Sequence, residues 1–389
     1  MNICILQTYL ILSLVSAAPG PPPAAPEGLE AAIDTAVATC GITADTPGVA
    51  VGVTIKDKLV FRKGYGLANL ADKTPIRPQT TFELASCSKQ FTGVAISILH
   101  DQGKLSFDDP ARNYISELPD SDANHPIHIR DLLHHTSGLP DYIGWPGIVG
   151  RDPNYLDNED YAKAIKENPS LVALRFTTGE KSEYCNNNYM LLALIVERVS
   201  KESYGAFMHD EVFKPLGMKR TWVYDRPKTP PKDKTLGFLN AVGYAKDDKG
   251  AWTAAWGSPP FRTERLLTVG DGGIWTCVED MAHWDAALRD HKLLKRETWN
   301  EFLAPSKTTD GKNNYYGFGL GTDRDDKGKL TWFGHGGAWG GFGTGYSRSV
   351  KGDYGWIFLA NGIDVGPVNT AISDFMAQAR SKPKKSKKH

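Results

Sequence analysis

Residues 82–100 of the chain read FELASCSKQFTGVAISILH. From residue 91 to residue 100 the apolar side chains recur at the spacing of a buried helix. Ser86 lies just before this run, where an N-cap or first-turn residue belongs, and Lys89 follows three positions later. Residues three apart share one face of a helical turn. The spacing therefore predicts the ammonium group of Lys89 beside the hydroxyl of Ser86, at the positive end of the helix.

This pair of side chains has a chemical and a structural interpretation. A nearby ammonium lowers the cost of ionising a serine hydroxyl, and a desolvated, neutral lysine can accept the hydroxyl proton itself. Ser-x-x-Lys also occurs by chance in many chains, with the serine as a helix cap and the lysine in solvent. The pattern therefore indicates a nucleophilic serine only if other segments of the chain support it.

Strand patterns occur near both ends of the chain, around a middle that is mostly helical. Residues 49–60 alternate in part and predict a hairpin that turns at 56–58. Three strand-like runs follow residue 330, and long loops are expected at 137–158 and 225–268. The late strands are predicted at 330–335, 341–350 and 354–361, and helices at 27–38, 91–100, 129–135, 160–167, 189–213, 279–289 and 368–379.

Two or three strands alone would bury their faces poorly, so the strands from the two ends are expected to join one sheet. We therefore predict an α/β (α+β) fold, in which an antiparallel sheet from both chain ends is flanked by helices and carries an inserted, mostly helical domain. The α/β domain is predicted to be discontinuous and to comprise 27–84 and 270–379. The helical domain, with its long loops, is predicted at 85–269.

The beginning of the chain has the pattern of an export signal. The first twenty residues carry no charge, and the apolar run at 3–15 is shorter than the roughly 20 residues that a bilayer span needs. Residues 1–17 are therefore predicted to be a signal peptide, and the protein to be secreted or periplasmic; an uncleaved amphipathic start is the alternative. Residues 18–26 are rich in proline and predict a short linker.

Charge is balanced over the whole chain but not along it. There are 45 Lys and Arg against 45 Asp and Glu, yet the last ten residues, RSKPKKSKKH, contain no acid. The body is therefore acidic, and residues 380–389 are expected to form a disordered basic tail. Balanced charge and export argue against a nucleic-acid partner. The tail either only solubilises the chain or makes weak, salt-sensitive contact with an anionic surface.

Two further motifs support a catalytic role for Ser86 and Lys89. Tyr184-Cys185-Asn186 directly precedes a predicted helix, and His335-Gly336-Gly337 ends a predicted strand. Together with Ser-x-x-Lys, these motifs resemble the three signatures of the serine β-lactamase and penicillin-binding protein superfamily. The resemblance is closest to its class C branch, which includes D-alanyl-D-alanine carboxypeptidases, D-aminopeptidases and family VIII esterases. It covers nearly the whole predicted mature chain, in fragments at 82–110, 129–142, 176–197, 212–221, 270–284 and 334–342.

The resemblance implies catalytic roles for four side chains. Ser86 would be the nucleophile that forms an acyl-enzyme, and Lys89 would accept or relay its proton. Tyr184 matches the general base of the family, its phenol made more acidic by the neighbouring lysine. Asn186 would bind the amide carbonyl of the substrate and hold Lys89 in place.

The third motif would bind the substrate. His335 takes the position from which a cationic or donor side chain contacts the leaving group or a substrate carboxylate. The backbone N–H groups of Ser86 and Ala338 would stabilise the oxyanion. Gly336 and Gly337 have no side chains and would let the substrate lie against the strand as an added edge. No metal or organic cofactor is implied.

Several of these residues also have a structural interpretation. Tyr184 could be a core aromatic residue, and His335 could only shape the pocket. The stretch 134–138, HHTSG, looks chemically active but corresponds to a structural loop of the family, so we leave it out of the site. Cys87 and Cys185 could form a disulfide, although buried free thiols are more common. The cysteines contain no C-x-x-C pair, which disfavours a zinc site.

The expected partner is a small-molecule or peptide substrate: a D-amino-acid amide, an ester or a β-lactam. G-x-S-x-G and H-E-x-x-H are absent, which disfavours an α/β-hydrolase and a zincin. His335 stands where efficient class C β-lactamases generally carry lysine, and it is charged only when protonated. We therefore expect a secreted serine hydrolase acting on D-amino-acid peptides or related amides. A carboxylesterase is the second candidate, because aromatic residues of the loops would suit an apolar acyl or ester group, and a non-catalytic penicillin-binding or scaffold protein is the third. These aromatic residues are Tyr142, Trp145, Tyr155, Trp252, Trp256, Phe261, Trp339 and Phe342.

Overall fold

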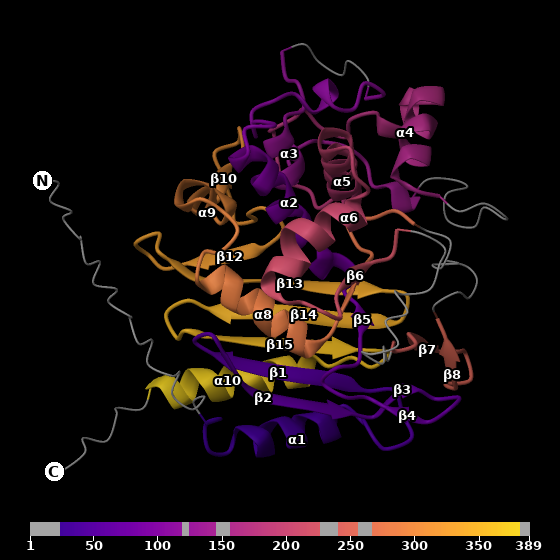
Figure 1. The fold of residues 1–389 in the computed structure, drawn as a ribbon, viewed down its shortest axis with the longest axis vertical. Helices are drawn as coiled ribbons and strands as arrows, with labels where there is room; N and C mark the ends of the chain where they lie inside the picture. The colour runs from indigo at the N-terminus through magenta and orange to yellow at the C-terminus, as the bar shows by residue number, and fades with distance from the viewer. Residues whose placement is uncertain (1–23, 119–123, 145–155, 226–239, 256–266, 382–389) are drawn as a thin grey trace, which may run out of the picture.

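A computed structural model describes residues 24–118, 124–144, 156–225, 240–255 and 267–381 (Figure 1). The predicted signal peptide, residues 18–23 of the predicted linker and residues 382–389 of the basic tail lie outside the described residues. Parts of the two long loops predicted at 137–158 and 225–268 lie outside them as well.

The centre of the fold is a six-stranded antiparallel sheet. Its strand order is β12-β13-β14-β15-β1-β2, so the N-terminal hairpin extends the sheet made by the C-terminal strands. β1 pairs with β15 from Val49 opposite Ala360 to Ile55 opposite Tyr354. The strands are β1 (Val49–Ile55), β2 (Lys58–Tyr65), β12 (Gly321–Arg324), β13 (Leu330–Trp339), β14 (Phe342–Ser349) and β15 (Tyr354–Ala360). The predicted fold class is confirmed, because the sheet is antiparallel and takes its strands from both chain ends.

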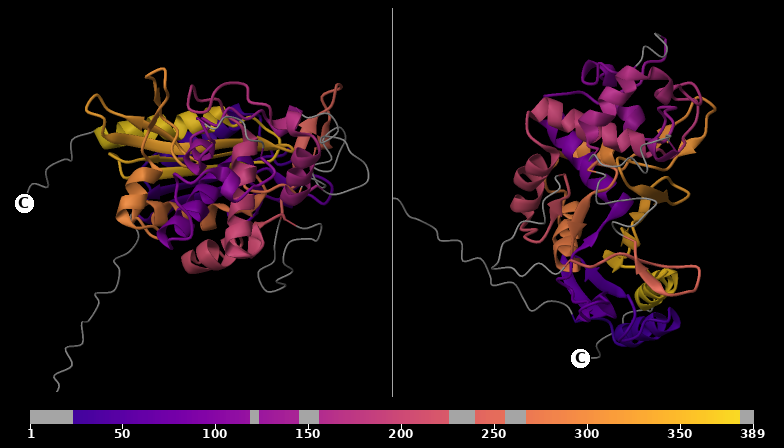
Figure 2. Two further views of the ribbon diagram at one scale, coloured as in Figure 1. Left: turned by 90° about the horizontal axis from the view of Figure 1, so that it is seen from above. Right: turned by 90° about the vertical axis from the view of Figure 1, so that its right-hand side faces the viewer.

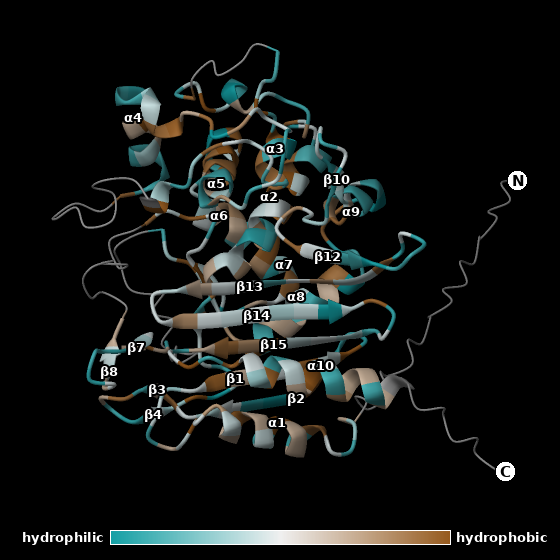
Figure 3. Cartoon of the chain, turned by 180° about the vertical axis from the view of Figure 1, so that it is seen from behind, coloured by the Kyte–Doolittle hydropathy of each residue, from teal (hydrophilic) through white to brown (hydrophobic). Residues whose placement is uncertain are grey.

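Helices cover both faces of this sheet. α1 (Leu29–Thr39) and α10 (Gly366–Ser381) lie side by side on one face, and α8 (Val278–Arg289) packs on the other (Figure 2 and Figure 3). Because both faces are covered, β1 reads VAVGVTI, which is nearly continuously apolar rather than alternating. One core cluster, which includes Val51 and Ile372, fills the space between the sheet and the helices α1 and α10.

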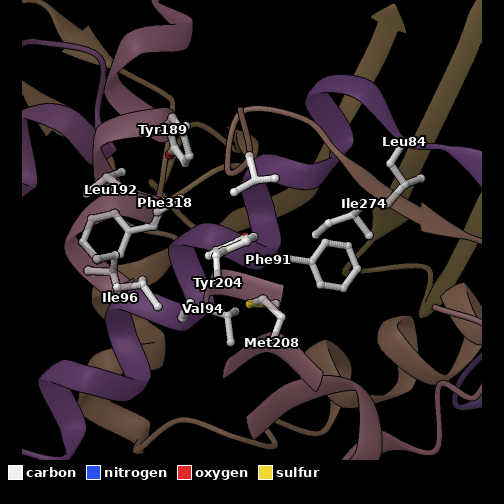
Figure 4. Packing of buried hydrophobic residues seen from close by; sticks show 14 of the residues in the cluster. Leu84, Phe91, Val94, Ile96, Tyr189, Leu192, Tyr204, Met208, Ile274 and Phe318 are labelled. Carbon is white, nitrogen blue, oxygen red and sulfur yellow. The ribbon is translucent and has the colours of Figure 1, made fainter. Parts of the chain in front are cut away.

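A helical part of the chain lies beyond the β12 edge of the sheet (Figure 1). At its centre is α2, in which every residue from Lys89 to Leu99 is buried. Figure 4 shows Phe91 and Val94 of α2 near Tyr204 and Met208 of α6. The helices of this part are α2 (Lys89–Asp101), α3 (Ile129–Leu133), α4 (Asn158–Glu167), α5 (Asn186–Ser200), α6 (Tyr204–Met208), α7 (Lys214–Leu216) and α9 (Arg296–Phe302). Within the described ranges, no helix has the length and apolar composition needed to cross a membrane.

Buried polar side chains fix α2 in place. Gln90 accepts a hydrogen bond from Nε1 of Trp284 on α8 (2.6 Å). Thr92 donates to the carbonyl of Gly270 (2.7 Å). Buried polar groups are stabilising only when they are paired in this way. The helix that follows Ser86 is therefore tied both to the sheet layer and to the segment that carries Asp271.

One helix prediction is wrong in part. The helix predicted over 189–213 ends at Ser200, because Lys201 adopts a left-handed conformation with φ of 67°. Ser203 then caps the separate helix α6 by accepting a hydrogen bond from the backbone N–H of Ala206 (3.2 Å). A π-helical turn, His209–Phe213, completes the segment. A local conformational break thus interrupts a run that apolar spacing alone predicts to be continuous.

Several loops are held in place by short strands, which apolar periodicity does not predict. β5 (Phe82–Glu83) pairs with β9 (Ile274–Thr276), and β9 also pairs with β6 (Trp222–Val223). This small sheet places the segment before Ser86 beside the segment after Asp271. A hairpin also occupies part of the predicted 225–268 loop. The remaining strands are β3 (Leu67–Asn69), β4 (Thr74–Pro75), β7 (Tyr244–Lys246), β8 (Trp252–Ala254), β10 (Ser306–Lys307) and β11 (Asn313–Asn314).

Candidate active site

Ser86 lies on a 3₁₀ turn, Ala85–Ser88, that connects β5 to α2. Ser86 was predicted to be an N-cap or first-turn residue, and it lies two residues before the observed N-cap instead. α2 begins at Lys89, after the 3₁₀ turn, and Ser88 precedes it as the N-cap residue. The difference arises because the chain must turn sharply from β5 into the helix, and apolar periodicity carries no information on such a turn.

The turn is strained and firmly anchored. Ala85 has a φ of 48°, a left-handed conformation that costs a residue with a side chain about 1–2 kcal/mol. Its backbone N–H donates to the carboxylate of Glu83 (2.8 Å). The hydroxyl of Thr344 on β14 donates to the carbonyl of Leu84 (2.7 Å). These bonds stabilise a conformation that presents Ser86 to the cleft.

Lys89 is fully buried, and its ammonium nitrogen contacts the hydroxyl of Ser86. Nζ donates to Ser86 Oγ (3.0 Å), to Asn186 Oδ1 (2.8 Å) and to the backbone carbonyl of Asp271 (2.9 Å). Burial lowers the pKa of Lys89 to about 8, although the charges of Asp271 and Asp141 oppose that shift. At this pKa roughly a tenth of Lys89 is neutral at pH 7 and able to accept a proton.

Asn186 is oriented by a carboxylate that the sequence reasoning did not identify. Asp141 Oδ2 accepts hydrogen bonds from the backbone N–H of Asn186 (2.8 Å) and from its Nδ2 (2.9 Å). The amide oxygen of Asn186 therefore points to Lys89. Asp141 belongs to the LPDY end of a fragment that resembles the family, and this was the signal that could have indicated it.

Tyr184 lies beside Lys89, with its ring centroid 4.9 Å from Lys89 Nζ. The expectation that the lysine makes its phenol more acidic is wrong. Burial raises the pKa of Tyr184, and a hydrogen bond with Ser86 only partly opposes this. The side chain is still 45% exposed, which moderates the effect of burial. Tyr184 is therefore protonated at neutral pH and suited to donate a proton.

His335 is neutral and has both ring nitrogens engaged. Nε2 pairs with the hydroxyl of Tyr316 (2.8 Å) and Nδ1 with the carbonyl of Gly336 (2.5 Å). Because the carbonyl can only accept, we assign the proton to Nδ1, so that Nε2 accepts from Tyr316. Burial, followed by the charge of Lys89, lowers the pKa of His335 to about 4. His335 does not line the cleft, and the geometry favours a structural rather than a catalytic interpretation of its side chain; no sequence pattern indicated Tyr316.

The strand segment after His335 forms one wall of the site. β12 pairs with β13 only as far as Gly334, so the following residues have a free edge toward the Ser86 turn. A Cβ atom at Gly337 would lie 2.3 Å from the Leu84 carbonyl oxygen and 3.0 Å from the Ser86 nitrogen. At Gly336 the nearest such atom would be 3.8 Å away. The close approach of the turn thus requires glycine at 337, a reason that is independent of the substrate contact implied by the resemblance.

A cleft of about 550 Å³, including its open mouth, extends from Ser86. Of the aromatic residues expected to suit an apolar group, Tyr142 and Trp339 line it, while 145, 155, 256 and 261 lie outside the described residues. Glu83 and Asp271 also line it and were not predicted. The lining residues are Glu83, Ala85, Ser86, Tyr142, Ile143, Asn186, Tyr224, Thr268, Asp271, Gly272, Gly273, Ala338 and Trp339.

The HHTSG segment that we left out of the site lies directly beneath it. The His135 ring centroid is 4.5 Å from that of Tyr184, and Nδ1 of His135 accepts a hydrogen bond from the backbone N–H of Cys185 (3.1 Å). His135 thus supports the loop that carries Tyr184.

Cys87 and Cys185 form no disulfide with each other. Both thiols are free, and they donate to different carbonyls, those of His335 (2.9 Å) and Pro140 (3.5 Å). Among the described residues, no three His, Cys, Asp or Glu side chains are placed to share a metal ion.

Comparison with known proteins places the chain in a family. The family model described as Beta-lactamase matches residues 29–380, and the chain belongs to this family. Penicillin-binding protein 4* of Bacillus subtilis (strain 168) is 29% identical over 78% of this chain and 65% of its own length. D-aminopeptidase of Brucella anthropi is 28% identical over 75% of this chain and 52% of its own. The chain thus spans only half to two thirds of the length of these relatives.

The fold is also similar to solved structures. The octameric penicillin-binding protein homologue from Pyrococcus abyssi superimposes with a TM-score of 0.73 at 24% identity, covering 91% of this chain and 77% of that one. At this level of identity the likeness shows the fold alone.

Proposed function

We propose that this protein is a serine hydrolase that forms an acyl-enzyme on Ser86 and acts on D-amino-acid peptides or related amides. The observation that carries the proposal is the 3.0 Å hydrogen bond between Lys89 Nζ and Ser86 Oγ, made by a lysine that is fully buried. Burial brings the pKa of Lys89 to about 8, so the lysine can act as a base near neutral pH. A solvated lysine cap would have neither property.

Acylation begins with transfer of the Ser86 hydroxyl proton to neutral Lys89. The serine oxygen bonds to the carbonyl carbon of the substrate, and the carbonyl electron pair moves onto its oxygen. Backbone N–H groups of Ser86 and Ala338 are the donors proposed for this oxyanion. Asn186, held by Asp141 and Lys89, is placed beside Ser86 on the cleft wall, where its remaining amide proton can meet an amide carbonyl of the substrate.

The second half of the reaction releases the amine. The carbon–nitrogen bond breaks, the oxyanion electrons re-form the carbonyl, and the leaving nitrogen takes a proton from Tyr184. The proton held by Lys89 replaces the one that Tyr184 has lost. Water then cleaves the ester on Ser86 and restores the hydroxyl. This order uses Tyr184 as an acid, which fits its raised pKa, and Lys89 as the base.

The charges of the cleft favour amides and amine-bearing substrates over β-lactams. A β-lactam drug carries a carboxylate, and His335 is neutral with both ring nitrogens engaged. Among the described residues that line the cleft there is no Arg or Lys, whereas two are acids. The relative from Brucella anthropi is named a D-aminopeptidase. We therefore expect slow turnover of β-lactams.

Two other functions use features of the same site and are distinguished by the experiment described below. A carboxylesterase would use the same Ser86 and Lys89, and the aromatic lining of the cleft would suit an apolar acyl group. A non-catalytic penicillin-binding or scaffold protein would bind without turnover. We also propose that the protein acts outside the cytoplasm; the support for this is the apolar, uncharged start of the chain.

The test is a set of steady-state rates on purified protein with D-alaninamide, a D-alanyl-D-alanine peptide, a p-nitrophenyl ester and nitrocefin. The proposal predicts turnover of D-amino-acid amides or peptides that is lost in Ser86→Ala. Ester turnover about a thousandfold above amide turnover, a gap of about 4 kcal/mol in transition-state stabilisation, would make the protein an esterase. Unchanged hydrolysis by Ser86→Ala would overturn the mechanism.

A further inference from the structure

Two buried carboxylates line the cleft next to the proposed nucleophile. The side chain of Glu83 is 1% exposed and that of Asp271 is 8% exposed. Buried carboxylates are normally paired with cations or with several hydrogen-bond donors. The hydrogen bonds of these two acids therefore show what each of them does.

Glu83 has a structural role that accounts for both of its oxygens. One accepts from the backbone N–H of Ala85 (2.8 Å) and the other from that of Gly273 (2.8 Å). These bonds hold the strained turn at Ser86 against the chain before β9. Burial and the nearby charge of Asp271 raise the pKa of Glu83 to about 7. Glu83 therefore offers no unoccupied oxygen to a bound substrate.

Asp271 differs, because only one of its oxygens has a partner. Oδ2 accepts from the hydroxyl of Tyr142 (2.8 Å), whereas Oδ1 is buried and has no hydrogen-bond partner. The neighbouring cation does not satisfy it, since Lys89 donates to the backbone carbonyl of Asp271. Leaving a buried carboxylate oxygen unpaired is costly, by about 1–3 kcal/mol or more. A bound group that donates to Oδ1 would recover this energy.

The position of Asp271 indicates which part of a substrate would meet it. Asn186 and Ala338 line the same cleft, whereas Tyr184 and His335, on the side of the leaving group, do not. Lys89 Nζ links the Asp271 carbonyl to Ser86 Oγ through hydrogen bonds of 2.9 and 3.0 Å. The acid is therefore beside the acyl half of a substrate, next to the carbonyl that Ser86 attacks. In a substrate whose N-terminal amino acid is unblocked, the polar group on this acyl half is the α-amino nitrogen.

We propose that Asp271 Oδ1 binds the free α-ammonium group of the substrate. This inference rests on the proposed function and makes it narrower: the substrates are D-amino-acid amides or peptides whose N-terminal amine is unblocked. The ammonium supplies the donor that Oδ1 lacks and the positive charge that the described lining of the cleft lacks.

The experiment compares two substrates that differ only at the amine: D-alanine p-nitroanilide and its N-acetyl derivative. Wild-type protein is expected to prefer the free amine by about 10- to 150-fold in kcat/KM, the range for a hydrogen bond to a charged group. Asp271→Asn is expected to remove most of this preference, mainly through KM. The amide keeps an oxygen for Tyr142 and turns an N–H donor toward the ammonium, so the shape of the side chain is preserved.

Asp280→Asn is the matched control. It also replaces a buried carboxylate, which accepts hydrogen bonds from the backbone N–H of Arg220 (2.7 Å) and the hydroxyl of Thr221 (2.8 Å), but Asp280 is not among the described residues that line the cleft. The ratio between the two substrates should therefore stay at the wild-type value. The ratio also cancels general losses of activity in either variant.

The outcomes separate this inference from the proposed function. A wild-type protein that cleaves neither anilide nor D-alaninamide overturns both. Equal or faster cleavage of the N-acetyl substrate by wild type overturns only the role of Asp271, and that result does not depend on the folding of any variant. An Asp271→Asn protein that keeps the wild-type ratio, or an Asp280→Asn protein that loses it to the same degree, also overturns that role.

Discussion

The layer in which α1 and α10 cover the sheet differs in composition from the cleft around Ser86. In that layer, which we call the α1/α10 layer, the core cluster is apolar and includes Val51 and Ile372. At the cleft the buried side chains include Glu83, Lys89 and Asp271. The first arrangement stabilises the protein by removing apolar surface from water, whereas the second places charges where burial disfavours them.

The difference indicates that the α1/α10 layer stabilises the fold and that the cleft serves activity. The cleft contains a left-handed alanine, an unpaired carboxylate oxygen and a lysine whose pKa is lowered by burial. Such features persist only when the surrounding structure is stable enough to hold them. Changes at the cleft should therefore alter activity more than stability, and changes in the α1/α10 layer should do the opposite.

The largest effect is expected for Lys89→Met, which keeps the length of the side chain and removes the base. Acylation should fall by about 10²- to 10⁴-fold, the range for a general base. Stability should change little, because relief from burying an ammonium offsets the hydrogen bonds lost to Asn186 and to the Asp271 carbonyl. Steady-state kinetics and thermal unfolding on the same preparation measure both. If the variant is unfolded and its activity falls only as much as its folded fraction, the contrast between the two regions is contradicted.

In the α1/α10 layer, Ile372→Ala should destabilise the protein by about 2–5 kcal/mol, because it leaves a cavity at a fully buried position of α10. The turnover of the molecules that remain folded should match wild type. Denaturant unfolding and active-site titration test this. Asp374→Ala, at an exposed position of the same helix, is the control and should stay within about 0.5 kcal/mol of wild type. A change in kcat per active site of Ile372→Ala would argue against separate roles.

The pH dependence of acylation tests the proposed role of Lys89 as the base. Only neutral Lys89 can accept the Ser86 proton, and burial lowers the pKa of Lys89 to about 8. Acylation by an uncharged ester should therefore rise about tenfold per pH unit below 8 and level off above it. A rate that is flat between about pH 6 and 9 would contradict the assignment.

Asp141→Asn distinguishes the titration of Lys89 from that of Glu83. The distinction is needed because burial raises the pKa of Glu83 to about 7. The charge of Asp141 raises the pKa of Lys89. Removing that charge should move the midpoint of the pH profile to lower pH. A midpoint that does not move would assign the titration to another group.

The smallest effect is expected for Tyr316→Phe, which removes the hydrogen bond to His335 Nε2 and keeps the ring. The loss of one such bond is worth about 0.5–1.5 kcal/mol, so kcat/KM should fall by about tenfold at most. Comparison of kcat/KM with wild type on one substrate measures it. A loss above about a hundredfold would show that the phenol of Tyr316 takes part in the chemistry.

The same contrast explains what the sequence could predict. The sheet and its helices follow from apolar spacing, which is a local property, so the hairpin at 49–60, the late strands and the terminal helix were predicted close to their observed bounds. Ser86 and Lys89 are three residues apart, so their proximity could also be predicted locally. The break at Lys201 could not, because a single left-handed residue leaves the apolar pattern on both sides unchanged.

The polar supports of the site depend on contacts between distant segments. Asp271 meets Lys89 across 182 residues, and Asp141 meets Asn186 across 45. Their fragments, LPDY and GDGGIW, carried a weak signal, because each places an acid among apolar residues and glycines. The pKa of Tyr184 was predicted in the wrong direction, because burial, which only the fold determines, outweighs the neighbouring lysine.

The central claim, that Ser86 is a nucleophile activated by buried Lys89, is tested most directly by intact-mass analysis after exposure to a slowly deacylating β-lactam. We predict a single covalent adduct on the wild-type protein, located on Ser86 by peptide mapping. Ser86→Ala should form no adduct, and Lys89→Met should form one far more slowly. An adduct on another residue, or equal labelling of wild type and Ser86→Ala, would contradict the account.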